Sequence, residues 1–507
     1  MMKRFLCTAA AFLAFIPSAS FAATISLPLE ISGWIPYWRS TVGVDNILPQ
    51  LPSFTEVNPF MYTVKQDGTL NQASPLTATE WVNLYNKMHA LNIRFVPTVM
   101  WSDSAAMDHI LNDPTLRAAH VKAIASEVYA HNLDGIDIDY EGKLATTKDG
   151  FSAFLKELNT AIGYDKWVMC TIEARTPLDS RYSSTASIPA DIAYANDFVQ
   201  INKYCDRVRV MAYDQGRIDL KLDASNTDPY APVADPAWVE KVMRVAMADI
   251  SPDKLEIGVP TYGYEYDMFN TTDGRYDPTL PASSNPVQYS LLWSFNPKYA
   301  TDMASALGLT PVRDSSGEMM LTYPASKSTD PTIPLPNAER VMVWSDAVSI
   351  QQKIDLAQKL GVRGISIFKI DGGEDPKIFD VLARYQFVHQ GVKPAIDGTR
   401  GGGSIAPGPS DTAGDPGTSA TAPSITPPTH VLELGSVSAD VRTLQRYLNA
   451  AGFAVALKGQ PGSSGYETSK FGAATRAALI RYQKAKKIRP AVGYYGPVTR
   501  AAMIASS

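Results

Sequence analysis

The chain has 507 residues, of which 45% are hydrophobic and 19% are charged, and its formal net charge is −5 at pH 7. An ordinary apolar share in a chain of this length predicts one large globular domain with a sizeable core, plus smaller additions. Beyond residue 22 no stretch of 18 apolar residues occurs, which excludes a membrane-spanning helix from that part of the chain.

The first 22 residues have the layout of a secretory signal peptide. A basic start, MMKR, precedes the apolar run FLCTAAAFLAFI, and small residues at Ser20 and Ala22 precede the expected cleavage site. An uncleaved membrane anchor is the alternative, but the run of 12 residues is short for one. We therefore expect a secreted or cell-envelope protein.

Two cysteines, Cys170 and Cys205, lie beyond the expected signal peptide. Export would permit a disulfide between them, and two free thiols fit the sequence equally well. The six histidines show no spacing that is typical of a zinc site. We expect neither a bound metal nor a cofactor.

Residues 23–390 form the expected main domain, in which strand-like apolar runs alternate with amphipathic helical stretches such as 77–92 and 347–361. Eight such alternations favour an α/β fold, a (β/α)8 TIM barrel, over the doubly wound open sheet, because no Gly-rich phosphate loop follows the first strand. The expected strands lie near residues 32–38, 56–64, 93–101, 133–141, 166–174, 207–214, 254–263 and 362–370. About 100 residues separate the last two, so we expect a small insertion between strands 7 and 8, at about 265–335.

Residues 391–430 contain mostly Gly, Pro, Ser, Thr and Ala and read as a flexible linker. Beyond them, 431–507 form an expected small C-terminal all-α domain with an internal echo, FGAATRAAL at 471–479 and YGPVTRAAM at 495–503. Its helical periodicity alone does not distinguish a specific module from a generic three-helix bundle.

The stretch LDGIDIDYEG, residues 133–142, is the most informative in the chain. Asp137, Asp139 and Glu141 alternate with apolar residues, as on a strand whose two faces differ. A calcium loop is one alternative, but the position that needs a glutamate is Lys148. A solvated edge strand is another, but the neighbouring isoleucines indicate a central strand.

In a barrel, the three carboxylates would point toward the axis, and the last would emerge at the mouth formed by the carboxyl ends of the strands. Crowded carboxylates in a confined site cannot all ionise, which raises the pKa of an acid toward the working pH. A carboxylic acid that keeps its proton can protonate a leaving group.

The pattern D-G-x-D-x-D-x-E, from Asp134 to Glu141, resembles the signature of glycoside hydrolase family 18, the chitinase-like enzymes. The segments MAYD, with Met211, Tyr213 and Asp214, and GVPTYGY, residues 258–264, resemble the family's sixth- and seventh-strand motifs. The segment VWSDAVSIQQKIDLAQKLGVRGISIFKI resembles the closing part of bacterial members linked to cell-wall and spore-wall hydrolysis. The resemblance covers roughly residues 30–388.

This resemblance implies cleavage of β-1,4 links beside N-acetylglucosamine, with retention, by attack of the substrate's own acetamide oxygen. Glu141 would protonate the glycosidic oxygen and later activate water. Asp139 would accept the acetamide N–H, and Asp137 would hold a proton shared with it. Tyr213 would bind the acetamide oxygen, and Asp214 would hold sugar hydroxyls.

One position departs from the family's pattern. The tryptophan that usually ends the eighth strand, under the sugar, is Phe368 here, and its smaller ring predicts weaker or altered binding. Tyr37, Phe60 and Trp101, near the ends of the first three expected strands, fit either sugar-facing or core positions. Met211, in the sixth-strand motif, is a further expected substrate contact.

The tail resembles the small peptidoglycan-binding module of bacterial wall hydrolases, on residues such as Leu444, Phe471, Thr475 and Tyr482. From residue 431 on, it has 11 Lys and Arg against 3 Asp and Glu, a net charge of +8, so the preceding residues sum to −13. A basic module on an acidic enzyme favours an anionic bacterial cell wall as partner. Export argues against nucleic acid.

The sequence therefore predicts a secreted glycosidase acting on peptidoglycan or chitin, with Glu141 as general acid and base. The alternative is a non-catalytic lectin of the same fold. Such lectins typically lose the terminal glutamate of the strand-four motif, whereas Glu141 is present here together with Asp139 and Tyr213.

Overall fold

The computed structural model describes residues 29–388, apart from 164, 228, 282 and 328–334, and most of the tail. In the tail, the described residues are 427–428, 432, 436, 438–456, 460–488, 493, 495 and 497–504. The expected signal peptide, 1–22, lies outside the described residues, and so does the expected linker, 391–430, apart from 427 and 428.

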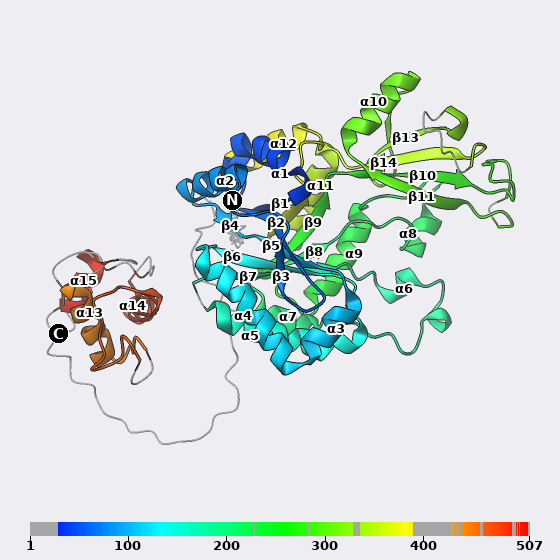
Figure 1. The fold of residues 1–507 in the computed structure, drawn as a ribbon. Coiled ribbons are helices and arrows are strands. Elements are labelled where there is room, and N and C mark those ends of the chain that lie inside the picture. Colours follow the sequence, from blue (N-terminus) through cyan, green and yellow to red (C-terminus); the bar gives the residue numbers. More distant parts are fainter. Residues whose placement is uncertain are drawn as a thin grey trace, which may run out of the picture.

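Eight parallel strands close into a barrel surrounded by helices (Figure 1), which confirms the predicted fold class. In spatial order the strands run β1-β15-β9-β8-β7-β6-β5-β2, and pairing of β1 with β2 closes the ring. Their bounds are β1 Glu30–Ile35, β2 Glu56–Val64, β5 Thr98–Trp101, β6 Gly135–Tyr140, β7 Trp167–Glu173, β8 Arg207–Met211, β9 Leu255–Pro260 and β15 Gly364–Phe368.

The strands form because their apolar residues are buried on both faces. β6 and β9 are buried along their whole length, as expected of parallel strands enclosed by helices. The third predicted strand is divided into β4, Arg94–Phe95, and β5, because Pro97 between them cannot donate to a ladder. A short strand, β3, Leu70–Gln72, pairs antiparallel with the outer end of β2.

The helices pack their apolar faces on this barrel. Aspartate side chains at residues 103, 113, 197, 235 and 346 accept hydrogen bonds from the first-turn N–H groups of α3, α4, α7, α9 and α11. The bounds are α1 Ser40–Ile47, α2 Thr79–Ala90, α3 Ser104–Asn112, α4 Pro114–Ala130, α5 Lys148–Ile162, α6 Leu178–Arg181, α7 Phe198–Tyr204, α8 Leu220–Ser225, α9 Pro236–Met247, α11 Ala347–Leu360 and α12 Lys377–Val388.

Between β9 and β15, the seventh and eighth barrel strands, the chain forms an antiparallel sheet in the order β11-β10-β14-β13-β12. The elements are β10 Gly263–Phe269, β11 Gln288–Phe295, α10 Pro297–Leu307, β12 Val312–Arg313, β13 Met319–Pro324 and β14 Glu339–Trp344. Phe295, Met303 and Trp344 belong to the small core shared by this sheet and α10. The predicted bounds of 265–335 stop short of β14.

A disulfide joins Cys170, on β7, to Cys205, which directly follows α7, with Cα atoms 5.9 Å apart. Both residues are buried in the core. The choice that the sequence left open, a disulfide or two free thiols, is thus resolved as a disulfide.

The C-terminal part is helical, as predicted: α13 Ala439–Ala450, α14 Ala473–Ala485 and α15 Pro497–Ile504. Leu444, Leu448, Phe471 and Tyr482 are among the residues of a core of its own. Thr475 and Thr499, the equivalent threonines of the two echoed segments, are both buried in α14 and α15. In the part of the chain that the structure describes, no helix is long and apolar enough to cross a bilayer.

Candidate active site

The three acids of the 133–142 stretch lie on and just after β6. Asp137 and Asp139 are buried in the barrel, opposite Thr98 and Met100 of β5 in the strand register. Glu141 is the first residue beyond the strand, is half-buried, and donates its backbone N–H to the carbonyl of Trp101 at 2.8 Å. The three acids therefore form a series from the barrel interior to its mouth, with Glu141 outermost.

Asp137 is fixed by three hydrogen bonds and one ion pair from four other strands. Its Oδ2 accepts from Trp34 Nε1 at 3.0 Å and Thr98 Oγ1 at 2.8 Å. Its Oδ1 accepts from Thr171 Oγ1 at 2.9 Å and forms an ion pair with Arg209, whose Nη1 lies 3.0 Å away. Both oxygens of Asp137 therefore have partners.

Asp139 has the opposite environment. Burial raises its pKa well above the usual range, and the carboxylates of Glu141 and Asp137 raise it further. Its Oδ1 finds no hydrogen-bond partner among the described residues, although it is buried. Asp139 therefore holds its proton to a higher pH than an ordinary aspartic acid does.

Glu141 also has a raised pKa. Partial burial is the largest cause, the nearby carboxylate of Glu173 is the next, and Asp214 adds to the effect. The ammonium of Lys143 acts in the opposite direction and lowers the pKa. A glutamic acid at the mouth of a barrel that holds its proton beyond its ordinary pKa is suited to general acid catalysis.

Tyr213 follows β8 and faces the same interior space. Its ring stacks on that of Phe368, at the end of β15, with centroids 5.7 Å apart and planes inclined by 18°. Burial raises the pKa of Tyr213 well above its usual value, and the charge of Asp139 adds to this, so the hydroxyl stays protonated and can donate. Phe368 is half-buried and lies where the resemblance places the floor of the sugar site.

Asp214 adopts a left-handed backbone conformation, with φ of 59°, which is uncommon for a residue other than glycine. Its Oδ1 accepts hydrogen bonds from the hydroxyl groups of Tyr262 and Tyr264, the latter at 2.7 Å. Sequence reasoning placed both tyrosines in the GVPTYGY motif without giving them a role. They hold the Asp214 carboxylate in place at the mouth.

Several aromatic residues near the mouth pack against one another. Phe60 is buried but packs 6.1 Å from Phe368 and 6.5 Å from Trp38, and Trp38 packs 5.0 Å from Tyr37. Trp38, whose surface is 53% exposed, was not singled out in the sequence, although it is adjacent to Tyr37. These rings form an apolar path outward from Phe368.

Two other expected residues lie differently. Trp101 is buried, 5.3 Å from the rings of His120 and Tyr140, so it belongs to the core and offers no face to a sugar. Met211 is half-buried at the end of β8 and packs against the main core, opposite Glu173 in the register of β7 and β8. Met211 therefore lies at the rim of the barrel, where the sequence predicts a substrate contact.

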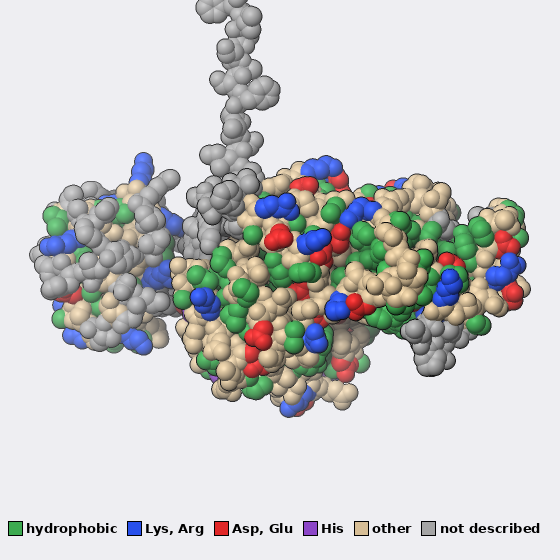
Figure 2. Space-filling model, turned by 90° about the horizontal axis from the view of Figure 1, so that it is seen from above, with side chains coloured by type: hydrophobic (Ala, Val, Ile, Leu, Met, Phe, Trp, Pro, Cys, Tyr) green, Lys and Arg blue, Asp and Glu red, His purple; other side chains and the backbone are tan. Residues whose placement is uncertain are grey.

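The described residues contain no group of three or more His, Cys, Asp or Glu arranged to hold a metal ion. Donor groups occupy both oxygens of Asp137, which is the wrong chemistry for a calcium ligand. On the face of the barrel that Figure 2 shows, the acidic and basic side chains of the described residues are interspersed. That face therefore lacks the continuous basic surface that nucleic acid would need.

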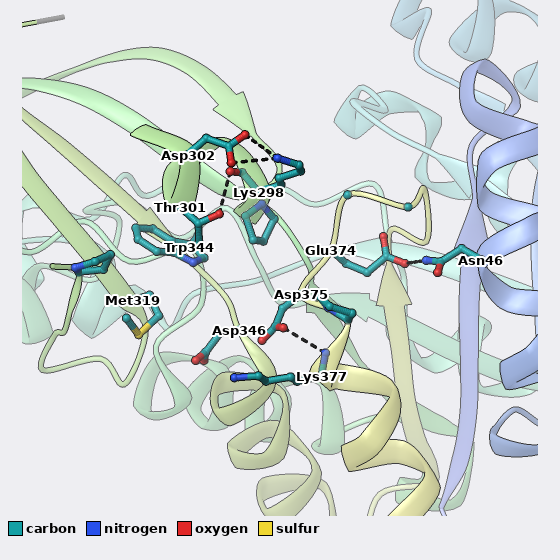
Figure 3. Close-up of a pocket in the computed structure, with 15 residues that line it drawn as sticks. Asn46, Lys298, Thr301, Asp302, Met319, Trp344, Asp346, Glu374, Asp375 and Lys377 are labelled. Carbon is teal, nitrogen blue, oxygen red and sulfur yellow. Dashed lines mark hydrogen bonds and ion pairs between the residues drawn. The ribbon is translucent and has the colours of Figure 1, made fainter. Parts of the chain in front are cut away.

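A cavity of about 680 Å³ lies away from these carboxylates, between the inserted sheet and the loop that follows β15 (Figure 3). Its polar groups largely satisfy one another: Lys298 pairs with Asp302 at 2.7 Å, and Asn46 donates to Glu374. It brings together no group of residues with evident catalytic chemistry.

Comparison with family models supports this description of the chain. The model described as "Glycosyl hydrolases family 18" matches residues 34–373, which includes every residue of the site above. The model described as "Putative peptidoglycan binding domain" matches residues 437–503. The two matches correspond to the barrel with its insertion and to the helical tail.

Individual relatives are distant. An uncharacterized glycosylase, YvbX, of Bacillus subtilis is 20% identical over 283 residues, covering 56% of this chain and 70% of the relative. The cortical fragment-lytic enzyme of Bacillus anthracis is 19% identical over 358 residues, covering 70% of this chain and 73% of the relative. Among solved structures, the Bacillus megaterium spore cortex-lytic enzyme SleL aligns with a TM-score of 0.53 at 19% identity, covering 71% of this chain and 75% of that chain, a similarity of fold.

Proposed function

The chain belongs to glycosyl hydrolase family 18, and from this we propose that it is an exported enzyme that cleaves β-1,4 links beside N-acetylglucosamine in peptidoglycan. The observation that carries the proposal is a proton-retaining glutamic acid, Glu141, at the mouth of the barrel, directly beyond the buried Asp139. A bound amino sugar over Phe368 would place its glycosidic oxygen near this acid.

In the proposed mechanism, Glu141 donates its proton to the glycosidic oxygen while the acetamide oxygen of the same sugar attacks the anomeric carbon. The leaving chain departs, and an oxazolinium ion remains in the site. Glu141, now a carboxylate, takes a proton from water, which opens the oxazolinium ring and restores the acetamide with retained configuration. Glu141 is reprotonated, so one water molecule is consumed for each bond that is cleaved.

The resting proton beside Glu141 is assigned to Asp139 alone. The sequence suggested a proton shared between Asp137 and Asp139, but three hydrogen bonds and an ion pair already engage both oxygens of Asp137. Asp139, with an unpartnered oxygen, can turn toward the substrate and accept the acetamide N–H on that oxygen.

Tyr213 and Asp214 complete the proposed site. The neutral hydroxyl of Tyr213 donates to the acetamide oxygen and so aligns the nucleophile with the anomeric carbon. Asp214, anchored by Tyr262 and Tyr264, accepts from sugar hydroxyls. Phe368 supports the apolar face of the sugar, and Phe60 and Tyr37 extend that surface outward.

Peptidoglycan is proposed over chitin because of the tail. The tail matches a peptidoglycan-binding family model and carries a net charge of +8, and a relative that spans most of the barrel is named a cortical fragment-lytic enzyme. We further propose that residues 1–22 direct export and that the linker at 391–430 tethers the catalytic domain, 23–390, to the wall-binding tail, 431–507.

The test is to incubate the purified protein, and a Glu141→Gln variant, with bacterial sacculi and with chitin oligomers, and to identify soluble products by mass. We expect fragments with N-acetylglucosamine at the new reducing end from sacculi, and a loss of about 10³-fold in rate for the variant. Equal rates for the two proteins would overturn the assignment of Glu141. Binding to sacculi without products from either protein would favour the lectin.

The chemical nature of the nucleophile has its own test. Sacculi from which the N-acetyl groups have been removed should resist cleavage, because the attacking oxygen is absent. Re-acetylated sacculi serve as the matched control. Undiminished turnover of the de-N-acetylated polymer would exclude substrate assistance.

A further inference from the structure

A second glutamate is fixed beside the proposed general acid. Glu173 is the last residue of β7, and its Oε1 accepts the backbone N–H of Gly142, the residue after Glu141, at 2.8 Å. Its Oε2 accepts from Asn196 Nδ2 at 2.7 Å. The carboxylate is therefore held against the segment that carries Glu141.

A buried lysine faces the same place from the other side. The side chain of Lys143 is 1% exposed, its Nζ lies 3.5 Å from Glu173 Oε2, and it donates to the backbone carbonyl of Tyr140. The ammonium also lies 4.8 Å from the centre of the Phe151 ring. These contacts place a positive charge just beyond the motif, two residues after Glu141.

The other charged and titratable groups around Glu141 are accounted for. They are Asp137 and Asp139 on β6, Tyr213 and Asp214 after β8, and Arg175 beyond β7. The guanidinium of Arg175 is stacked on the rings of Tyr194 and Phe198 and donates to the carbonyl of Asn196 at 2.9 Å. Glu173 and Lys143 are thus two groups of opposite sign that are held against the backbone on either side of Glu141, at Gly142 and Tyr140.

The electrostatic effects of the two groups agree with this geometry. After partial burial, the Glu173 carboxylate is the largest cause that raises the pKa of Glu141, and Lys143 lowers that pKa. Burial raises the pKa of Glu173 itself, but Lys143, the Gly142 N–H and the Asn196 amide together hold it below its usual value. Glu173 consequently ionises at a lower pH than Glu141.

We propose that Glu173 and Lys143 are positioning residues of opposite effect that set the pH at which Glu141 loses its proton. The Glu173 carboxylate keeps the proton on Glu141, and the Lys143 ammonium limits how far that effect extends. The inference rests on the proposed role of Glu141 as general acid. Neither residue needs to touch the substrate to act in this way.

The experiment measures kcat/KM against pH for soluble peptidoglycan fragments with the full chain and two variants. In Glu173→Gln the hydrogen bond from Gly142 can persist while the charge is lost, so the alkaline limb should move down by about 0.5–1 pH unit. In Lys143→Met a positive charge is lost, so the same limb should move up by a similar amount. Lys143→Arg should restore the position of the limb.

The chain offers a matched control pair. Glu157 is 37% exposed in its side chain, against 38% for Glu173, and it too is bound by a largely buried cation, Arg117, at 2.9 Å. This pair joins α5 to α4 on the outside of the barrel. Glu157→Gln and Arg117→Met should leave both limbs of the profile where they are in the unaltered protein.

The outcomes separate the inference from the proposed function. An inactive Glu141→Gln variant, with alkaline limbs for Glu173→Gln and Lys143→Met that coincide with the unaltered protein, would overturn the inference and leave the function standing. An active Glu141→Gln variant would overturn the function. If Lys143→Met does not fold, the Glu173→Gln variant, whose substituted side chain is half-exposed, provides the test. Lower activity at every pH without a shift of the alkaline limb would show that Glu173 has only a structural role and would overturn the inference.

Discussion

The barrel contains two sets of buried carboxylates, one at each end of its interior, and their environments are opposite. At the amino ends of the strands, Glu30 lies between three guanidinium groups, those of Arg94, Arg207 and Arg363, at 2.5–2.9 Å. These cations outweigh the effect of burial and hold the pKa of Glu30 well below its usual value. At the carboxyl ends, burial raises the pKa of Asp139.

Glu256 shows that burial beside an arginine is not enough to lower a pKa. Glu256 also lies at the amino ends of the strands, in the group of buried carboxylates and arginines that we call the lower cluster. Its one guanidinium contact is Arg209, at 3.3 Å, and its other partners in the described structure are serine hydroxyl groups. Burial, together with the charges of Glu30 and Glu56, raises its pKa despite Arg209. The number and distance of the cations decide the direction of the shift.

The two ends therefore serve different purposes with the same residue type. At the amino ends of the strands, carboxylates paired with arginines link neighbouring strands. At the carboxyl ends, Asp139 and Glu141 have no direct cationic partner among the described residues, and the pKa of each is raised. Asp137 lies between the two sets and is bound to the lower one through Arg209. Substitutions in the two sets of carboxylates should therefore have different effects on stability and on activity.

The largest effect is expected from Arg209→Met. Arg209 contacts Glu56, Glu256 and Asp137, all fully buried, so its loss leaves negative charges without a partner. The free energy of unfolding should fall by about 3–5 kcal/mol, measured by denaturant titration.

The control for Arg209→Met is an exposed arginine. Arg244 pairs with Glu240 one helical turn away and is 59% exposed in its side chain, so Arg244→Met should cost no more than about 0.5 kcal/mol. Adding Glu56→Gln to Arg209→Met should restore part of the loss. Similar stabilities for the two single variants would contradict the account of the lower cluster.

A smaller effect, of opposite sign, is expected from Asp139→Asn. Because the folded-state pKa of Asp139 lies above its unfolded value of 3.8, the unfolded chain releases this proton first as pH rises, and stability falls across the interval between the two values. Asparagine has no proton to release, so the variant should match the unaltered protein near pH 3.5 and exceed it by about 1–2 kcal/mol at pH 7.

Activity should change in the other direction. In Asp139→Asn an amide NH2 replaces one carboxyl oxygen and competes for the position that faces the acetamide N–H, so we expect turnover to fall by about 10²-fold although the protein is more stable. Thermal unfolding at pH 3.5 and pH 7 measures the first effect and product release the second. Asp302→Asn, on the exposed face of α10, should alter neither; a destabilised Asp139→Asn at pH 7 would contradict the assignment of the proton.

Much of this arrangement could be predicted from local patterns. The eight strands were predictable because each is a short apolar run that is buried on both faces, and the acids of β6 because three of them alternate within one such run. The insertion was predictable from chain length alone, but its sheet was not, since β10 pairs with β11 and β14 across 19 to 81 residues.

The rest depends on contacts that form only when the barrel closes. Arg209 meets Glu56 across 153 residues, and no property of either residue's neighbours indicates the partner. Trp34 reaches Asp137 across 103 residues in the same way. Trp38 lay beside the predicted site residue Tyr37, but whether a side chain at a strand end turns outward or inward is set by the neighbouring strands.

The smallest effect concerns Asp137, where the two sets meet. Thr171→Val removes one of its three hydrogen-bond donors and keeps the shape of the side chain, so the free energy of unfolding should fall by about 1 kcal/mol. Thr98→Val removes a donor to the other oxygen and should cost a similar amount. Denaturant titration measures both effects. If both variants were as stable as the unaltered protein, these hydrogen bonds would not be what fixes Asp137 between the two sets.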